Sequence, residues 1–124
     1  MESSSEYNAT RLAEAEGLFM QDADQLYRQM AEFEHKEGFA GDALAWGMER
    51  FTIVTARTKA TICSNDIIQN IWNNERVARR GELLCLIADI VLGLMAGVAG
   101  LIVAALIVKE GLDALCRADW GESE

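Results

Sequence analysis

The feature that most constrains this chain is an uninterrupted apolar run at residues 90–108, IVLGLMAGVAGLIVAALIV, which holds nineteen residues without a charged side chain. A helix needs about 20 residues to cross the roughly 30 Å hydrocarbon core of a bilayer. The run therefore has the length of a membrane span. The alternative is a pair of core helices, residues 83–95 and 101–116, that fold back on each other at the glycine-rich sequence AGVAG.

Two considerations favour the membrane interpretation. A helix that is apolar on every face must be buried on every face, either in a large core or in a bilayer. A bundle built from only 124 residues rarely encloses a whole helix in this way. We therefore expect residues 83–109 to form a transmembrane helix. A soluble four-helix bundle with residues 83–116 as its core hairpin stays open as the alternative.

The rest of the chain has the pattern of long amphipathic helices. There is no proline among the 124 residues, and ten glycines are available as helix ends. Residues 10–37 carry an apolar stripe at spacings of three, four and seven, formed by Leu12, Phe19, Ala23, Leu26, Met30 and Phe33. Residues 42–80 carry a second stripe, formed by Ile53, Ala56, Ala60, Cys63, Ile67 and Ile71. The two helices are expected to form a coiled-coil-like hairpin.

Short polar segments predict where these helices begin and end. Gly38 is placed to end the first helix, and Asp42 is placed to cap the second. The sequence SND at residues 64–66 could cap a further helix and so break the second one. The chain is therefore predicted to be all-α, with a flexible N-terminus at 1–9, an amphipathic helical hairpin at 10–82, an apolar membrane helix at 83–109 and an acidic tail at 110–124.

The net charge of −9 is unevenly distributed along the chain. Residues 1–49 carry a net charge of −8, residues 50–82 carry +3, and residues 83–124 carry −4. This distribution predicts no nucleic-acid partner, since phosphate binding needs a concentrated basic surface. Three arginines precede the apolar run, namely Arg76, Arg79 and Arg80. By the positive-inside rule they set the topology, which places the N-terminal region in the cytoplasm and the short acidic tail on the opposite side of the membrane.

Small residues recur along one side of the apolar run. They are Gly93, Ala96, Gly97, Gly100 and Ala104. Such a face allows two helix backbones to approach closely, so it predicts helix packing and a homo-oligomer. Asp89 lies four residues before Gly93 on the same side. We expect it to form a polar site at the membrane edge, because an ionisable group there is costly unless it faces protein or water.

No pattern of residues predicts a reaction, a metal or a cofactor. Cys63, Cys85 and Cys116 are odd in number and widely spaced, which argues against a disulfide framework and a zinc cluster and favours a reducing compartment. Glu32 and His35 have the spacing of an iron-ligand pair, but His35 is the only histidine and no second pair accompanies it. The chain also lacks the glycine-rich loops that bind phosphates.

These features together predict a non-enzymatic, single-pass membrane protein that acts as a helical interaction or oligomerisation module. Its partners would be membrane lipid and either further copies of itself or a helical protein. A membrane-inserting pore former, in which Asp89 lines the mouth, is the first alternative, and a secreted translocator component is a variant of it. A soluble helical adaptor is the second alternative.

Overall fold

The fold consists of helices throughout the part of the chain that the computed structural model describes, which is residues 9–34, 42–94, 98–117 and 120. In chain order the helices are α1 (Ala9–Phe19), α2 (Ala23–Glu34), α3 (Ala43–Cys63), α4 (Asp66–Asn74), α5 (Arg80–Val91), α6 (Val98–Glu110) and α7 (Leu112–Leu115). The absence of proline allows α3 to run for 21 residues without a break. The all-α prediction is confirmed.

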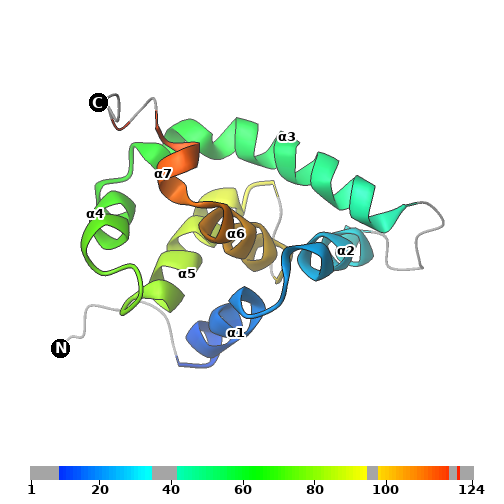
Figure 1. Cartoon of the computed structure of the whole chain (residues 1–124), viewed down its shortest axis with the longest axis horizontal. Helices are drawn as coiled ribbons and strands as arrows, with labels where there is room; N and C mark the ends of the chain where they lie inside the picture. Colours follow the sequence, from blue (N-terminus) through cyan, green and yellow to red (C-terminus); the bar gives the residue numbers. More distant parts are fainter. Residues whose placement is uncertain (1–8, 35–41, 95–97, 118–119, 121–124) are drawn as a thin grey trace.

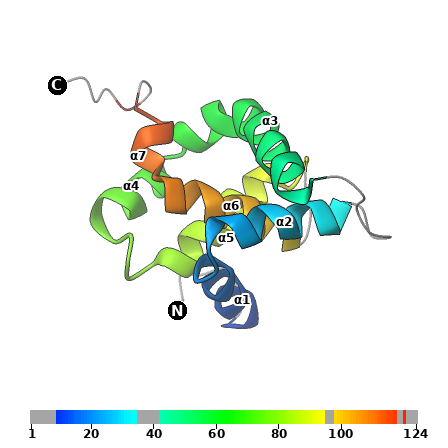
Figure 2. The same ribbon diagram turned by 45° about the vertical axis from the view of Figure 1, so that its right-hand side comes forward.

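Helix α6 lies at the centre of the fold. Figure 1 and Figure 2 show it in the middle of the molecule, with the other helices arranged around it. It packs against α1, α2, α5 and α7. All eight side chains from Leu101 to Val108 are buried. Over these two turns no face of the helix is left to solvent, and each large aliphatic side chain buried there stabilises the fold by about 1.5–3 kcal/mol.

The membrane prediction is wrong. Among the described residues no helix combines the length and the apolar character needed to cross a bilayer. The apolar run is divided, because α5 ends at Val91 and α6 begins at Val98. Three predictions are therefore wrong: a single helix over residues 83–109, an N-terminal region in the cytoplasm, and an acidic tail on the opposite side of a membrane. The physical reason is that the surrounding helices supply enough apolar surface to enclose α6, which the small size of the chain was expected to prevent.

Helices α5 and α6 pack against each other as a core hairpin, as the alternative for residues 83–116 predicted. Seven residues of α5 are buried, so it also supplies a large part of the core. The alternative also predicted a four-helix bundle, whereas the described part of the chain forms seven helices. The number is larger because each long helix predicted for the N-terminal region is interrupted, and because Gly111, with a φ of 103°, separates α7 from α6.

Polar side chains mark both interruptions. The helix predicted at 10–37 is divided into α1 and α2, and the Asp22 side chain accepts a hydrogen bond from the Gln25 backbone N–H where α2 begins (2.9 Å). The predicted break in the second helix is confirmed, since the Asn65 side chain accepts from the Ile68 N–H at the start of α4 (2.9 Å). Each cap satisfies a backbone donor that the first turn leaves unpaired, so it fixes the point where a new helix starts.

Of the hairpin predicted for residues 10–82, only α2 and α3 pack together as two paired helices, whereas α1 packs against α5 and α6. Gly38, the predicted end of the first helix, lies outside the described residues. Asp42 caps α3 as predicted and accepts a hydrogen bond from the Ala45 N–H (3.1 Å). The two helices approach closely at Gly47, where an added Cβ would overlap the carbonyl oxygen of Tyr27 and lie 2.7 Å from its carbonyl carbon. A side chain at position 47 would therefore push α3 away from α2.

The three arginines predicted to set a membrane topology make side-chain contacts within the protein instead. Arg76 lies over the Trp72 ring (4.0 Å), Arg79 pairs with Glu75 (3.1 Å) and Glu82 (2.7 Å), and Arg80 pairs with Glu16 (2.9 Å). The last of these pairs joins α5 to α1. Pairs as accessible as these contribute at most about 1 kcal/mol each, so they orient the surface helices more than they stabilise them.

Candidate functional site

A stripe of residues on α3 lies mostly on the side of the helix that faces away from the core, although its first member, Trp46, packs partly against the core. Its members alternate at spacings of three and four, which places them in line along one side of the helix. We call this stripe the α3 seam, and it consists of Trp46, Glu49, Ile53, Ala56 and Ala60. Trp46 is half-buried and the other four are exposed. The seam is therefore open to solvent along most of α3.

Helix α3 has two stripes with helical spacing, and the structure places the other one in the core. The buried side consists of Gly47, Val54, Thr58 and Ile62. The Thr58 hydroxyl donates to the Val54 carbonyl oxygen (2.9 Å), so this polar side chain is buried without an unpaired donor. Ile53, Ala56 and Ala60, which belong to the apolar stripe predicted for residues 42–80, lie on the exposed side of α3.

Cationic side chains flank the α3 seam. If the seam residues occupy the a and d positions of a heptad, with Trp46 at a, then Arg50 and Arg57 occupy e positions and Lys59 occupies a g position. None of these three cations forms an ion pair with another described residue. Glu49 is the only acidic member of the seam. The borders of the seam are thus positive, in a chain whose net charge is −9.

A surface hollow of about 200 Å³ lies in the N-terminal half of the seam. It is lined by Trp46, Glu49, Arg50 and Ile53. The Nε atom of Arg50 is shielded from solvent and has no hydrogen-bond partner among the described residues. A buried donor without an acceptor costs about 1–3 kcal/mol, so the Arg50 guanidinium is incompletely satisfied at this hollow.

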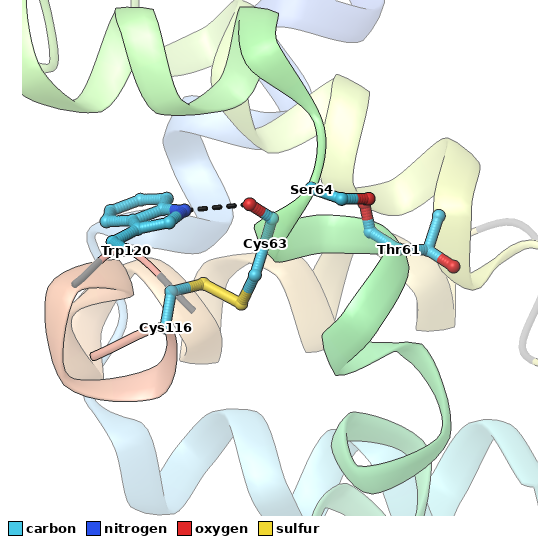
Figure 3. The surroundings of a disulfide bond; sticks show 5 residues. All are labelled: Thr61, Cys63, Ser64, Cys116 and Trp120. Carbon is cyan, nitrogen blue, oxygen red and sulfur yellow. Dashed lines mark hydrogen bonds between the residues drawn. A yellow bond between two sulfur atoms is a disulfide. The ribbon is translucent and has the colours of Figure 1, made fainter. Parts of the chain in front are cut away.

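A disulfide bond between Cys63 and Cys116 joins the end of α3 to the end of α7, as Figure 3 shows. Beside it, the indole N–H of Trp120 donates to the Cys63 carbonyl oxygen (2.7 Å). The argument against a disulfide is therefore wrong, and the odd count arises from Cys85, which is buried in α5. Burial raises the pKa of the Cys85 thiol, which keeps it protonated at neutral pH. The argument for a reducing compartment loses its basis.

The small residues predicted to form one packing face are divided by the break between α5 and α6. Gly93 follows α5 and is exposed, with open space where a Cβ would lie. Gly100 and Ala104 are buried within α6. Ala96 and Gly97 lie outside the described residues. A role for these five residues in self-association stays a prediction.

Asp89, predicted as a polar site at a membrane edge, lies on the exposed side of α5. Its Oδ1 accepts a hydrogen bond from Nη2 of Arg11 on α1 (3.2 Å). The contact is a second ion pair between α1 and α5, beside the one made by Arg80. In the structure Asp89 therefore helps to hold the N-terminal helix on the core hairpin.

Neither the side chains nor comparison with known proteins points to a particular chemistry. Within the described ranges, no three His, Cys, Asp or Glu side chains gather closely enough to hold a metal ion. His35 of the Glu32–His35 pair lies outside those ranges. The comparisons gave no relative, since no protein-family model, no curated protein and no solved structure matches the chain.

Proposed function

We propose that this protein is a non-enzymatic helical interaction module whose α3 seam binds an acidic amphipathic helix of a partner protein. The observation that carries the proposal is the heptad-spaced stripe with cationic borders on the exposed side of a 21-residue helix. Apolar side chains at this spacing are typical of a surface that packs against another helix. In the chain by itself Ile53, Ala56 and Ala60 face solvent, whereas Trp46 is half-buried.

The shape of the seam suits a helix that lies along α3. Ala56 and Ala60 have small side chains, which let a partner helix approach closely. Trp46 and Ile53 add larger apolar groups beside the hollow, and tryptophan is enriched among the residues that dominate binding energies. From Trp46 to Ala60 the seam extends for about 21 Å at 1.5 Å per residue. A partner helix of about three heptads would cover it completely.

The charges beside the seam favour an acidic partner. Side chains at e and g positions form ion pairs between helices and decide which helices associate. Arg50, Arg57 and Lys59 fill three of the four flanking positions, and Thr52 fills the fourth. Glutamate or aspartate on the partner would pair with these cations, whereas the α3 seam of a second copy would bring like charges together. The occupant is therefore a different, acidic helix.

Two synthetic peptides of three heptads test the charge requirement. Both carry leucine at the a and d positions, and they differ only at e and g, which hold glutamate in one and lysine in the other. We expect the glutamate peptide to bind the full chain one to one, at least about tenfold more tightly than the lysine peptide, in isothermal titration calorimetry. The difference should shrink at high salt, because exposed ion pairs are screened.

A matched pair of variants tests the position of the site. Ile53→Asp and Ile67→Asp each place a carboxylate at an exposed isoleucine, 40% exposed on α3 and 55% exposed on α4. We expect Ile53→Asp to weaken binding of the glutamate peptide about tenfold or more, and Ile67→Asp to leave it unchanged. Equal binding by the two variants would contradict the proposal. So would equal binding of the two peptides to the unaltered chain.

Interaction with a helical partner was already one of the functions predicted from the sequence, and the proposal now assigns a surface to it. The surface belongs to α3, whereas the sequence had placed the packing face in the apolar run. The pore former and the secreted translocator component remain predictions, and no feature of the described helices favours either of them.

A further inference from the structure

A second concave site lies between α3, α6 and α7, apart from the α3 seam. Its volume is about 270 Å³. Phe51 and Thr55 line it from α3, Ile107 and Glu110 line it from α6, and Leu115 lines it from α7. The disulfide bond at the end of α7 holds this wall of the cavity against α3. The cavity therefore has walls from three helices, two of which are joined covalently.

The walls are apolar except for Thr55 and one carboxylate. Glu110 is the only charged residue that lines the cavity among the described residues. Its Oε2 accepts a hydrogen bond from the Tyr27 hydroxyl (3.2 Å), and Oε1 accepts none from the residues that the structure describes. Burial and the nearby Glu110 carboxylate raise the pKa of Tyr27 to about 12, so the hydroxyl stays a donor at neutral pH. The C-terminal end of α6 adds the negative end of a helix dipole.

We propose that this cavity binds a small organic cation, namely a primary ammonium group on an apolar body of about six carbon atoms. The ammonium group would form a charge-assisted hydrogen bond with Oε1 of Glu110. The alkyl chain would lie between Phe51 and Leu115, where its burial removes apolar surface from water. The volume of about 270 Å³ is just below the range typical of drug-sized ligands, which suits a compact amine. The site does not depend on the helical-partner proposal.

Three probes of one size and different charge test this inference: hexylammonium, hexanol and hexanoate. Each is titrated into the full, disulfide-bonded chain, and binding is followed by the NMR shifts of the backbone amides. We expect hexylammonium to bind saturably, hexanol about tenfold more weakly, and hexanoate most weakly, because Glu110 attracts a cation and repels an anion. The shifts should concentrate in the parts of α3, α6 and α7 that line the cavity.

Variants assign the charge preference to Glu110. Glu110→Gln removes the charge and keeps an oxygen that can accept from the Tyr27 hydroxyl. We expect this variant to bind hexanol as before and to lose its preference for hexylammonium over hexanol. Asp113→Asn is the control, since it removes an exposed carboxylate that does not line the cavity, and it should keep the preference. Ala114→Phe, which places a ring at the cavity wall, should abolish binding of both ligands.

Three results would overturn the inference. They are equal binding of hexylammonium and hexanol to the unaltered chain, a preference for hexylammonium that survives Glu110→Gln, and no saturable binding of hexylammonium at millimolar concentration. Because Glu110 is exposed, Glu110→Gln leaves the core intact, and a circular dichroism spectrum checks that the variant is folded. The measurements on the unaltered chain decide the matter even if Ala114→Phe fails to fold.

Discussion

Replacing Leu106 by alanine is expected to lower the free energy of unfolding by about 2–5 kcal/mol, near the upper end of that range. Leu106 has no exposed surface and lies in the enclosed part of α6. Other helices pack around α6, so the truncation leaves an internal cavity into which the surrounding side chains can relax only partly. Urea denaturation, followed by circular dichroism, measures the change as a shift in the midpoint at constant slope.

Leu92→Ala is the matched control for this prediction. Leu92 stands at the end of α5 and is 55% exposed, so the same truncation removes little buried surface. We expect it to change the free energy of unfolding by no more than about 0.5 kcal/mol. If the two variants lose equal stability, α6 is not enclosed in the way described.

Removal of the Cys63–Cys116 disulfide is expected to lower the free energy of unfolding by about 4 kcal/mol. This value follows from the entropy that the unfolded chain regains when a link between cysteines 53 residues apart is removed. The bond restricts the unfolded chain, and in the folded chain it fixes α7 to α3. Urea denaturation of the oxidised chain and of the double variant Cys63→Ala/Cys116→Ala measures the difference. Matching midpoints for the two proteins would contradict this prediction.

A thiol titration is the control for the disulfide itself. The unreduced chain should show one reactive thiol after denaturation, contributed by Cys85, and three after treatment with a reductant. Three thiols before reduction would mean that the bond does not form in the protein, and the stability difference would then have another cause.

Local rules predicted the helices and several of their ends from the sequence. The caps at Asp42 and Asn65 follow from side chains that can reach a backbone N–H in the first turn, and this is a property of a few neighbouring residues. Local rules do not predict the environment of residues 90–108, because a helix that is apolar on every face has the same local pattern in a bilayer and in a protein core. What decides between them is how much apolar surface the rest of the chain can place around it.

The α3 seam shows a second limit of local patterns. Both stripes of α3 have helical spacings, namely three and four in one and four and seven in the other, so periodicity alone does not say which of them faces the core. Gly47 and Thr58 look unlike core residues in the sequence, yet they are buried: the glycine because α2 passes too close for a side chain, and the threonine because its hydroxyl bonds to its own helix. Only the packing of α2 on α3 reveals the exposed stripe.

The disulfide and the cavity depend on contacts between residues far apart in the chain. Three cysteines allow three pairings, and the sequence offers no reason to choose the one that spans 53 residues. The cavity likewise needs α3, α6 and α7 to meet, and Glu110 is one acidic residue among many in the sequence. Neither feature leaves a motif that could have been found without the fold.

Native-state hydrogen exchange of the unaltered chain, in buffer without detergent, tests most directly the central claim that the apolar run supplies an enclosed core helix. The amides of residues 102–108 are predicted to exchange only through global unfolding, so their protection should equal the free energy of unfolding measured with urea. Two results would contradict the account. One is exchange in this segment as fast as at the exposed start of α1, and the other is a chain that is helical only when detergent is present.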